Sequence, residues 1–210
     1  MPDTSLLRNF NATCGGGLVL NKDVYDMQPG EALQLINFEP STEGGYRRLN
    51  GTTKYNSTIV PQVALANERI QMSAIFNDKI VVARGGTVSY GGTSGSWTSL
   101  ATSQGTTHTY DFDKFNFNGT SKIIIATGEA AAFTVDSSFN VDVINATGGG
   151  TAPTNPKFVK TFANHVFYGG MSNSTHSILF SVPFQEDNFT SGSGAGEIKV
   201  GDIVTGLKVF

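Results

Sequence analysis

The sequence contains the run Phe115-Asn116-Phe117-Asn118-Gly119-Thr120-Ser121-Lys122-Ile123-Ile124-Ile125-Ala126, which has the pattern of a β-hairpin. An aromatic strand is followed by a two-residue turn and then by a β-branched strand. The apolar residues Ile123–Ile125 are continuous and do not alternate with polar ones. A strand of this kind is buried on both faces, so we expect other sheets to pack on either side of it.

The same order of apolar strand, short turn and β-branched strand recurs along the chain. Two further copies lie at Ile75–Ala83 and Phe162–Gly169, and a fourth begins at Ile203–Phe210. The equivalent aromatic residues, spaced by 41, 45 and 48 residues, are Phe76, Phe117, Phe162 and Phe210. A period of about 40–50 residues that carries four short strands is typical of a propeller blade. We therefore expect an all-β chain in which residues 66–210 form a β-propeller-like domain of short antiparallel strands, with about three blades and the start of a fourth.

The first 65 residues have a different character and indicate an N-terminal extended arm. Met27-Gln28-Pro29-Gly30 has the composition of a tight turn. Ala32–Phe38 alternates apolar and polar residues, which predicts a short strand with Leu33 and Leu35 on one face. We expect residues 1–65 to form short strands that lie over another surface.

Five residues of this arm are candidates for a subunit interface: Leu35, Phe38, Tyr46, Arg47 and Arg48. The two arginines are the densest basic feature of the chain. They are able to pair with a carboxylate on a partner or to contact a phosphate. One arginine pair does not make a nucleic-acid binding site, because such sites need many phosphate contacts.

The repeats found in the sequence are too few for the closed ring of blades that a propeller forms. In the third repeat the remaining strand candidates are Ser177–Ser181 and a looser Phe184–Phe189. Helical periodicity is nearly absent, and Val63–Arg69 is the one short helix that we expect. Three blades and a single strand do not close a ring, because propellers have at least four blades. Either the chain is the N-terminal part of a longer protein, which its end at an apolar strand favours, or the arm and neighbouring chains supply the missing strands.

Composition excludes several classes of protein. Glycine accounts for 25 of the 210 residues and charged residues for 15%, which is unlike a helical bundle. The net charge of −3 argues against a basic nucleic-acid binder, and the single Cys14 excludes an internal disulfide framework. No apolar run approaches the roughly 18 residues of a membrane helix, and the first residues lack the order of a signal peptide.

The sequence offers little that predicts catalysis, and we expect no catalytic, cofactor-binding or metal-binding residues. The three histidines, at positions 108, 165 and 176, share no spacing typical of a metal site. Asp111 and Asp113 lie on one strand face, as paired carboxylates of a glycosidase do, but such pairs also occur by chance. Trp97 follows a Ser-Gly-Ser turn that is similar to the Asp-box of sialidases without its aspartate, so we interpret it as a packing residue. Seven Asn-x-Ser/Thr triplets indicate a turn-rich polar surface.

Several short motifs, taken in order, resemble the tail nozzle or head-to-tail stabilisation (tail tube) proteins of tailed bacteriophages. They cover both ends of the chain: Gly16–Leu18, Met27–Leu33, Asn37–Pro40, Gly44–Gly51, Phe180-Ser181, Phe189 and Ile198–Leu207. The resemblance implies a structural component of the virion, with a propeller in each subunit and no enzymatic activity. It implies a homo-oligomeric ring, commonly a hexamer, that seals and extends the DNA exit channel below the portal and adaptor. The portal, the adaptor and tail fibre proteins are then its partners, and double-stranded DNA passes through without specific binding.

Two other functions stay open at this point. A sialidase-like or kelch-like propeller enzyme requires a funnel with clustered arginine and acidic residues. A glycan-binding host-attachment module requires aromatic residues on the propeller loops. Glycosidase activity of the purified protein favours the first, and glycan binding without ring assembly favours the second.

Overall fold

The computed structural model describes residues 16–40, 45–62 and 69–210, and in this part of the chain the fold is all-β. Its helical elements there are two single turns, η2 (Val24–Asp26) and η3 (Ser191–Ser193). The chain divides into two compact units, Met1–Lys54 and Tyr55–Phe210. We call them the arm unit and the sheet unit.

The arm unit contains two small sheets. β1 (Gly17–Leu18) pairs in parallel with β2 (Glu31–Ala32), and β3 (Phe38–Pro40) pairs antiparallel with β4 (Tyr46–Arg48). The predicted continuous strand over Ala32–Phe38 is wrong. Strand structure stops at Ala32 and resumes at Phe38, and Asn37, directly before β3, has a φ of 60°, which extended backbone does not tolerate.

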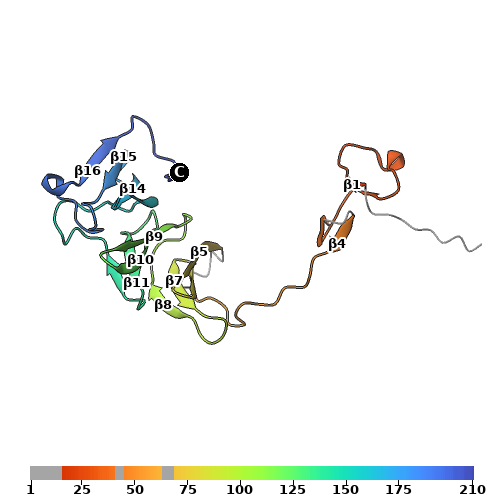
Figure 1. Cartoon of the computed structure of the whole chain (residues 1–210), viewed down its shortest axis with the longest axis horizontal. Coiled ribbons are helices and arrows are strands. Elements are labelled where there is room, and N and C mark those ends of the chain that lie inside the picture. The colour runs from red at the N-terminus through yellow and green to blue at the C-terminus, as the bar shows by residue number, and fades with distance from the viewer. Residues whose placement is uncertain (1–15, 41–44, 63–68) are drawn as a thin grey trace, which may run out of the picture. The chain divides into compact units, whose positions relative to one another are not determined.

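The sheet unit consists of three four-stranded antiparallel sheets, each formed by consecutive strands (Figure 1). The first sheet contains β5 (Ile70–Phe76), β6 (Lys79–Arg84), β7 (Thr87–Gly91) and β8 (Thr98–Ala101). The second contains β9 (Asp111–Phe117), β10 (Thr120–Ala126), β11 (Phe133–Asp136) and β12 (Val141–Val143). The third contains β13 (Phe158–Phe162), β14 (His165–Met171), β15 (Ser174–Phe180) and β16 (Gly196–Lys199).

The first hairpin of every sheet closes through the same kind of turn. The turn residues are Asn77-Asp78, Asn118-Gly119 and Ala163-Asn164, and all six have positive φ, between 45° and 81°. Two consecutive residues with positive φ are the requirement of a type I′ turn, which matches the twist of antiparallel strands. Asparagine, aspartate and glycine tolerate this backbone better than other residues do, so the recurrent turns follow directly from the sequence.

Two apolar clusters hold the three sheets together. Ile123 and Ile125 of β10 face the first sheet, where they meet residues such as Val81 and Phe76. Ile124, on the opposite side of β10, faces the third sheet and Tyr168. All three isoleucines are fully buried, which confirms the prediction that this strand is covered on both faces.

The structure corrects two further predictions about the end of the chain. The fourth strand of the third sheet is β16 and not Phe184–Phe189: Phe184 has a φ of 61°, and Phe189 is buried in the core. Residues 203–210, expected to begin a fourth repeat as a strand, form no strand. Residues 63–68 of the predicted short helix lie outside the described part of the chain, and Arg69 is not helical.

Candidate subunit interface

Four of the five predicted interface residues meet in the β3–β4 hairpin. Phe38 lies opposite Arg48 and Glu39 opposite Arg47 in the antiparallel register. Because side chains alternate along a strand, Tyr46 and Arg48 share one face of β4 and Arg47 points to the other. Leu35 is half-buried in the irregular segment between β2 and β3, so the structure does not place it in the hairpin.

The two arginines of the hairpin differ in their pairing. The Arg47 Nε atom donates to Glu39 Oε1 at 2.6 Å across the strand pair. Both groups are open to solvent, so the pair adds little stability. Arg48 takes part in none of the four ion pairs formed among the described residues. Of the two, Arg48 is therefore the one whose charge is available to a partner.

The arm unit exposes a large part of its apolar side chains. None of its described residues is buried. The exposed large apolar residues are Leu18, Leu20, Val24, Tyr25, Leu33, Ile36, Phe38 and Leu49. Apolar surface of this extent on a small unit is typical of a segment that packs against another molecule.

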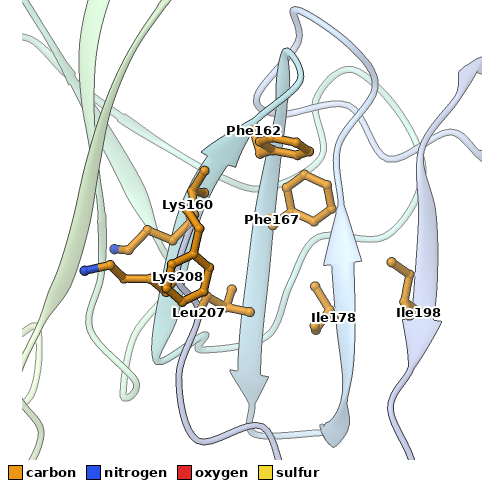
Figure 2. A pocket seen from close by; sticks show the side chains of 9 residues that line it. Lys160, Phe162, Phe167, Ile178, Ile198, Leu207 and Lys208 are labelled. Carbon is orange, nitrogen blue, oxygen red and sulfur yellow. The ribbon is translucent and has the colours of Figure 1, made fainter.

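A second apolar surface, which the sequence analysis did not identify, covers one side of the third sheet. The register places Phe167 opposite Phe180, and Ile178 opposite Ile198, so these four residues share one face of the sheet with Phe162. We call this set the open face. A groove of about 300 Å³ runs along it, and Figure 2 shows its labelled side chains spread over adjacent strands. The signal was present in the sequence, since Phe167 alternates with the core residues Val166 and Tyr168.

The last residues of the chain lie along this open face. The Val204 backbone N–H donates to the Thr175 carbonyl at 2.9 Å, and Val204 is buried. A β-carbon placed on Gly169 would lie 3.0 Å from Val204 Cγ1 and 3.4 Å from Leu207 Cδ1, so the glycine allows this close approach. Leu207 and the residues after it line one side of the groove.

The loop between β7 and β8 of the first sheet, in contrast, is contacted by the segment that precedes this sheet. The Asn56 Nδ2 atom donates to the carbonyls of Gly92 and Gly95, at 3.0 and 3.2 Å. The Trp97 indole N–H donates to the Thr58 carbonyl at 2.9 Å, and its ring occupies the space beside Gly91. This position agrees with the predicted packing role of Trp97. The Asn-x-Ser/Thr triplet at Asn56 likewise serves as a structural cap.

The carboxylates considered for catalysis connect the second and third sheets. Asp111 Oδ2 accepts the Val159 N–H at 3.0 Å, and Asp113 Oδ2 accepts the Thr161 N–H at 2.6 Å. The Lys160 ammonium group also reaches Asp111 Oδ1, at 2.6 Å. Both carboxylates are thus held by donors of β13, and this arrangement describes a structural connection between neighbouring strands.

Two other carboxylates cap the linkers between the sheets. Asp187 Oδ1 accepts the N–H groups of Asn145 and Ala146 at 2.8 and 2.7 Å, and Asp187 Oδ2 accepts that of Thr147 at 3.0 Å. Glu129 accepts three backbone N–H groups of residues 106–108 in the same manner. Desolvation alone would raise the pKa of Glu129, but the hydrogen bonds from the linker outweigh it and hold the pKa below its usual value of 4.5.

His165 and the two tyrosines whose pKa values burial raises strongly, Tyr110 and Tyr168, also have structural partners, and the Tyr168 hydroxyl donates to the Glu186 carbonyl at 3.1 Å. His165 Nδ1 lies 2.6 Å from the Ser181 carbonyl. Burial raises the pKa of Tyr110 to about 12, so its hydroxyl stays protonated and donates to the Gly105 carbonyl at 2.6 Å. Within residues 16–40, 45–62 and 69–210, no three His, Cys, Asp or Glu side chains are grouped as a metal site requires.

Comparisons with known proteins add no relative: no family model, no curated protein and no solved structure matches this chain. Among the described residues, no helix is long and apolar enough to cross a membrane. The two apolar surfaces, on the arm unit and on the third sheet, are therefore the features on which a functional proposal rests.

Proposed function

We propose that this chain is a structural subunit of a tailed-bacteriophage virion, a tail nozzle or head-to-tail connector protein that assembles into a ring. The observation that carries the proposal is the combination of a stack of sheets, apolar at one end, with an arm unit in which none of the described residues is buried. Such a chain has surfaces for neighbouring subunits, and the two carboxylates considered for catalysis, Asp111 and Asp113, accept backbone N–H groups of β13. The motif resemblance to phage nozzle proteins supplies the class of assembly.

The three sheets are interpreted here as consecutive blades of a β-propeller-like structure. Three features support this interpretation: each sheet is a four-stranded meander, successive sheets share an apolar core, and β9 of one sheet contacts β13 of the next. In propellers the first strand of each blade lies nearest the axis. The Asp111 and Asp113 connections to β13 would then hold adjacent blades together at the centre.

The charge of the chain suits a conduit that DNA crosses without being bound. The net charge is −3, with 14 basic and 17 acidic residues. A wall with a strong basic surface would retain DNA through phosphate contacts, and a slightly acidic one releases it. A ring of this protein would accordingly seal the channel below the portal and adaptor and guide the DNA.

The experiment that tests this function is the detection of the protein in purified particles of the phage that encodes it. Mass spectrometry of the virion should identify the chain, and negative-stain images of the isolated protein should show rings. Antibody labelling should place it at the junction of head and tail. A protein that is monomeric and absent from the particles would refute the assignment.

A further inference from the structure

We infer that the arm unit of one copy of this chain covers the open face of the third sheet in a second copy. The inference rests on the proposed function, a ring of identical subunits, and it names the surface of the neighbour that receives the arm. It concerns contact between two molecules and makes no statement about the arrangement of the two units within one.

The open face continues an interface that the chain already forms twice. The first and second sheets bury an apolar cluster between them, and so do the second and third. The next position in this series is the open face, which carries Phe167 and Ile178; of the described residues outside the third sheet, those that line its groove are residues 207–210. Its exposed residues Phe162 and Ile198 leave an apolar surface still in contact with water.

The arm unit also has apolar side chains in contact with water, which makes it complementary to the open face. It brings exposed apolar side chains, among them Ile36 and Phe38, but contains no buried residue in its described part. Its paired strands are two or three residues long, and sheets of two strands are marginally stable alone. An apolar partner surface supplies the burial that the arm unit lacks.

The charged residues beside the groove also favour contact between the open face and an arm unit. The charged residues that line the groove are Lys160 and Lys208, and no carboxylate lines it. Figure 2 shows the two ammonium groups extending to one side of the groove. Lys160 is paired with Asp111, whereas Lys208 takes part in none of the ion pairs formed among residues 16–40, 45–62 and 69–210. The arm unit has charged residues without a partner in those four pairs, among them Asp26 in its exposed turn η2 and Arg48 in the β3–β4 hairpin, and the turn with Asp26 is the part that we expect to face Lys208.

A contact between an arm and a sheet face is heterologous, which means that the two copies use different surfaces. The assembly as a whole then keeps one free arm and one free face, and it grows until a ring closes. Contact between two open faces would be isologous and would end at a dimer. The two arrangements therefore predict different behaviour of variants.

Two full-length variants test the inference. The arm variant carries Ile36→Asp and Phe38→Asp, and the face variant carries Phe162→Glu and Ile198→Glu, all at exposed positions. Size-exclusion chromatography with light scattering should show that the wild type assembles and that each variant alone is monomeric. An equimolar mixture of the two variants should form a one-to-one dimer, because one intact arm and one intact face remain. Circular dichroism confirms that the variants are folded.

A control variant, Ile75→Glu, changes an equally exposed apolar residue of the first sheet and should assemble as the wild type does. Assembly of the arm variant on its own would overturn the inference, as would a mixture that stays monomeric. Either of these results leaves the proposed function standing if the wild type still forms rings and is found in particles. A monomeric wild type that is absent from particles refutes both.

Discussion

Tyr25 and Tyr168 represent the two units of this protein. Tyr25, in the arm unit, is 96% exposed, whereas Tyr168, in the sheet unit, is 0% exposed and packs against Phe189. The same residue type thus contributes to a core in one unit and to a surface in the other. The difference indicates that the sheet unit is stable through its own packing, while the apolar residues of the arm unit are available for a partner.

Replacing each of these tyrosines with alanine, in two separate variants, should give the largest difference in the free energy of unfolding. Tyr168→Ala leaves a cavity between the second and third sheets and removes the hydrogen bond to the Glu186 carbonyl. We expect it to lower the free energy of unfolding by about 3–5 kcal/mol. Tyr25→Ala should change it by less than about 0.5 kcal/mol, because the side chain is already in water.

Urea unfolding, followed by tryptophan fluorescence, measures the free energy of unfolding of both variants. The chain has a single tryptophan, Trp97, which lies in the sheet unit and reports on the unfolding of that unit. Tyr168→Phe serves as the control that retains the ring and should lose only about 0.5–1.5 kcal/mol with the hydroxyl. Equal losses from Tyr25→Ala and Tyr168→Ala would mean that the arm unit is part of the same cooperative core.

The next largest difference in the free energy of unfolding is expected between two aspartates, one in each unit, whose carboxylates accept backbone N–H groups. Asp187→Ala leaves three N–H groups of the linker between the second and third sheets without their acceptor. We expect a loss of about 1–2 kcal/mol, as for the removal of a helix cap. Asp23→Ala removes the acceptor of one N–H, that of Tyr25 in the arm unit, and should not change the tryptophan-detected transition.

Asp187→Asn separates the carboxylate charge from the shape of the side chain. It should recover part of the loss, because the amide oxygen still accepts hydrogen bonds from the linker. If Asp187→Ala unfolds at the same urea concentration as the wild type, the linker between the sheets does not contribute to their association.

The hairpins were predictable from sequence because their information is local. An apolar strand, an Asn-rich two-residue turn and a β-branched strand determine both the turn type and the pairing, as in Phe115–Ala126. β16 was missed because its pairing is not local: Ile198 lies opposite Ile178 across a long loop. Within that loop Phe184–Phe189 has the composition of a strand, but Phe189 enters the core instead. In the arm, alternation around Leu35 predicted a strand that the backbone at Asn37 interrupts.

The candidate interface was predictable in part. Aromatic and basic residues in a turn-rich segment indicated Phe38, Tyr46, Arg47 and Arg48 as candidates, and all four lie in the β3–β4 hairpin, a strand pair that the sequence did not predict. The open face was predictable only in part, because Val166, Phe167 and Tyr168 form a continuous apolar run, which is also typical of a strand buried on both faces. Only the packing of the sheets shows that the side with Val166 is covered and that the side with Phe167 is not.

Lowering the pH should have a smaller effect on the free energy of unfolding, and this effect should differ between the two units. The pKa of Glu129 is lowered in the folded state, so its contribution is complete above the usual value of 4.5 and disappears as the pH falls through the lower folded value. Glu129→Gln should therefore unfold more easily than the wild type near neutral pH, and the difference should vanish in acid. Solvent reaches this carboxylate, so the effect stays below that of Asp187→Ala.

The pKa of Glu31, in the arm unit, is lowered as well, by hydrogen bonds from Lys22 and the Gln28 N–H. Glu31→Gln is the matched control and should leave the acid response of Trp97 fluorescence unchanged. A difference between Glu129→Gln and wild type that stays constant with pH would contradict the assignment of the acid response to this carboxylate.

The smallest expected effect is a gain in stability at the turn between β13 and β14. Ala163 has a φ of 48° there, a backbone conformation that alanine adopts at a cost and glycine adopts freely. Ala163→Gly should raise the free energy of unfolding, by no more than about 1 kcal/mol, because the relief of strain exceeds the added flexibility of the unfolded chain. Asn37→Gly, at a φ of 60° in the arm unit, should leave the tryptophan-detected transition unchanged. A loss of stability from Ala163→Gly would show that the turn tolerates alanine without strain, and the recurrent type I′ geometry would then depend on the strands and not on the turn residues.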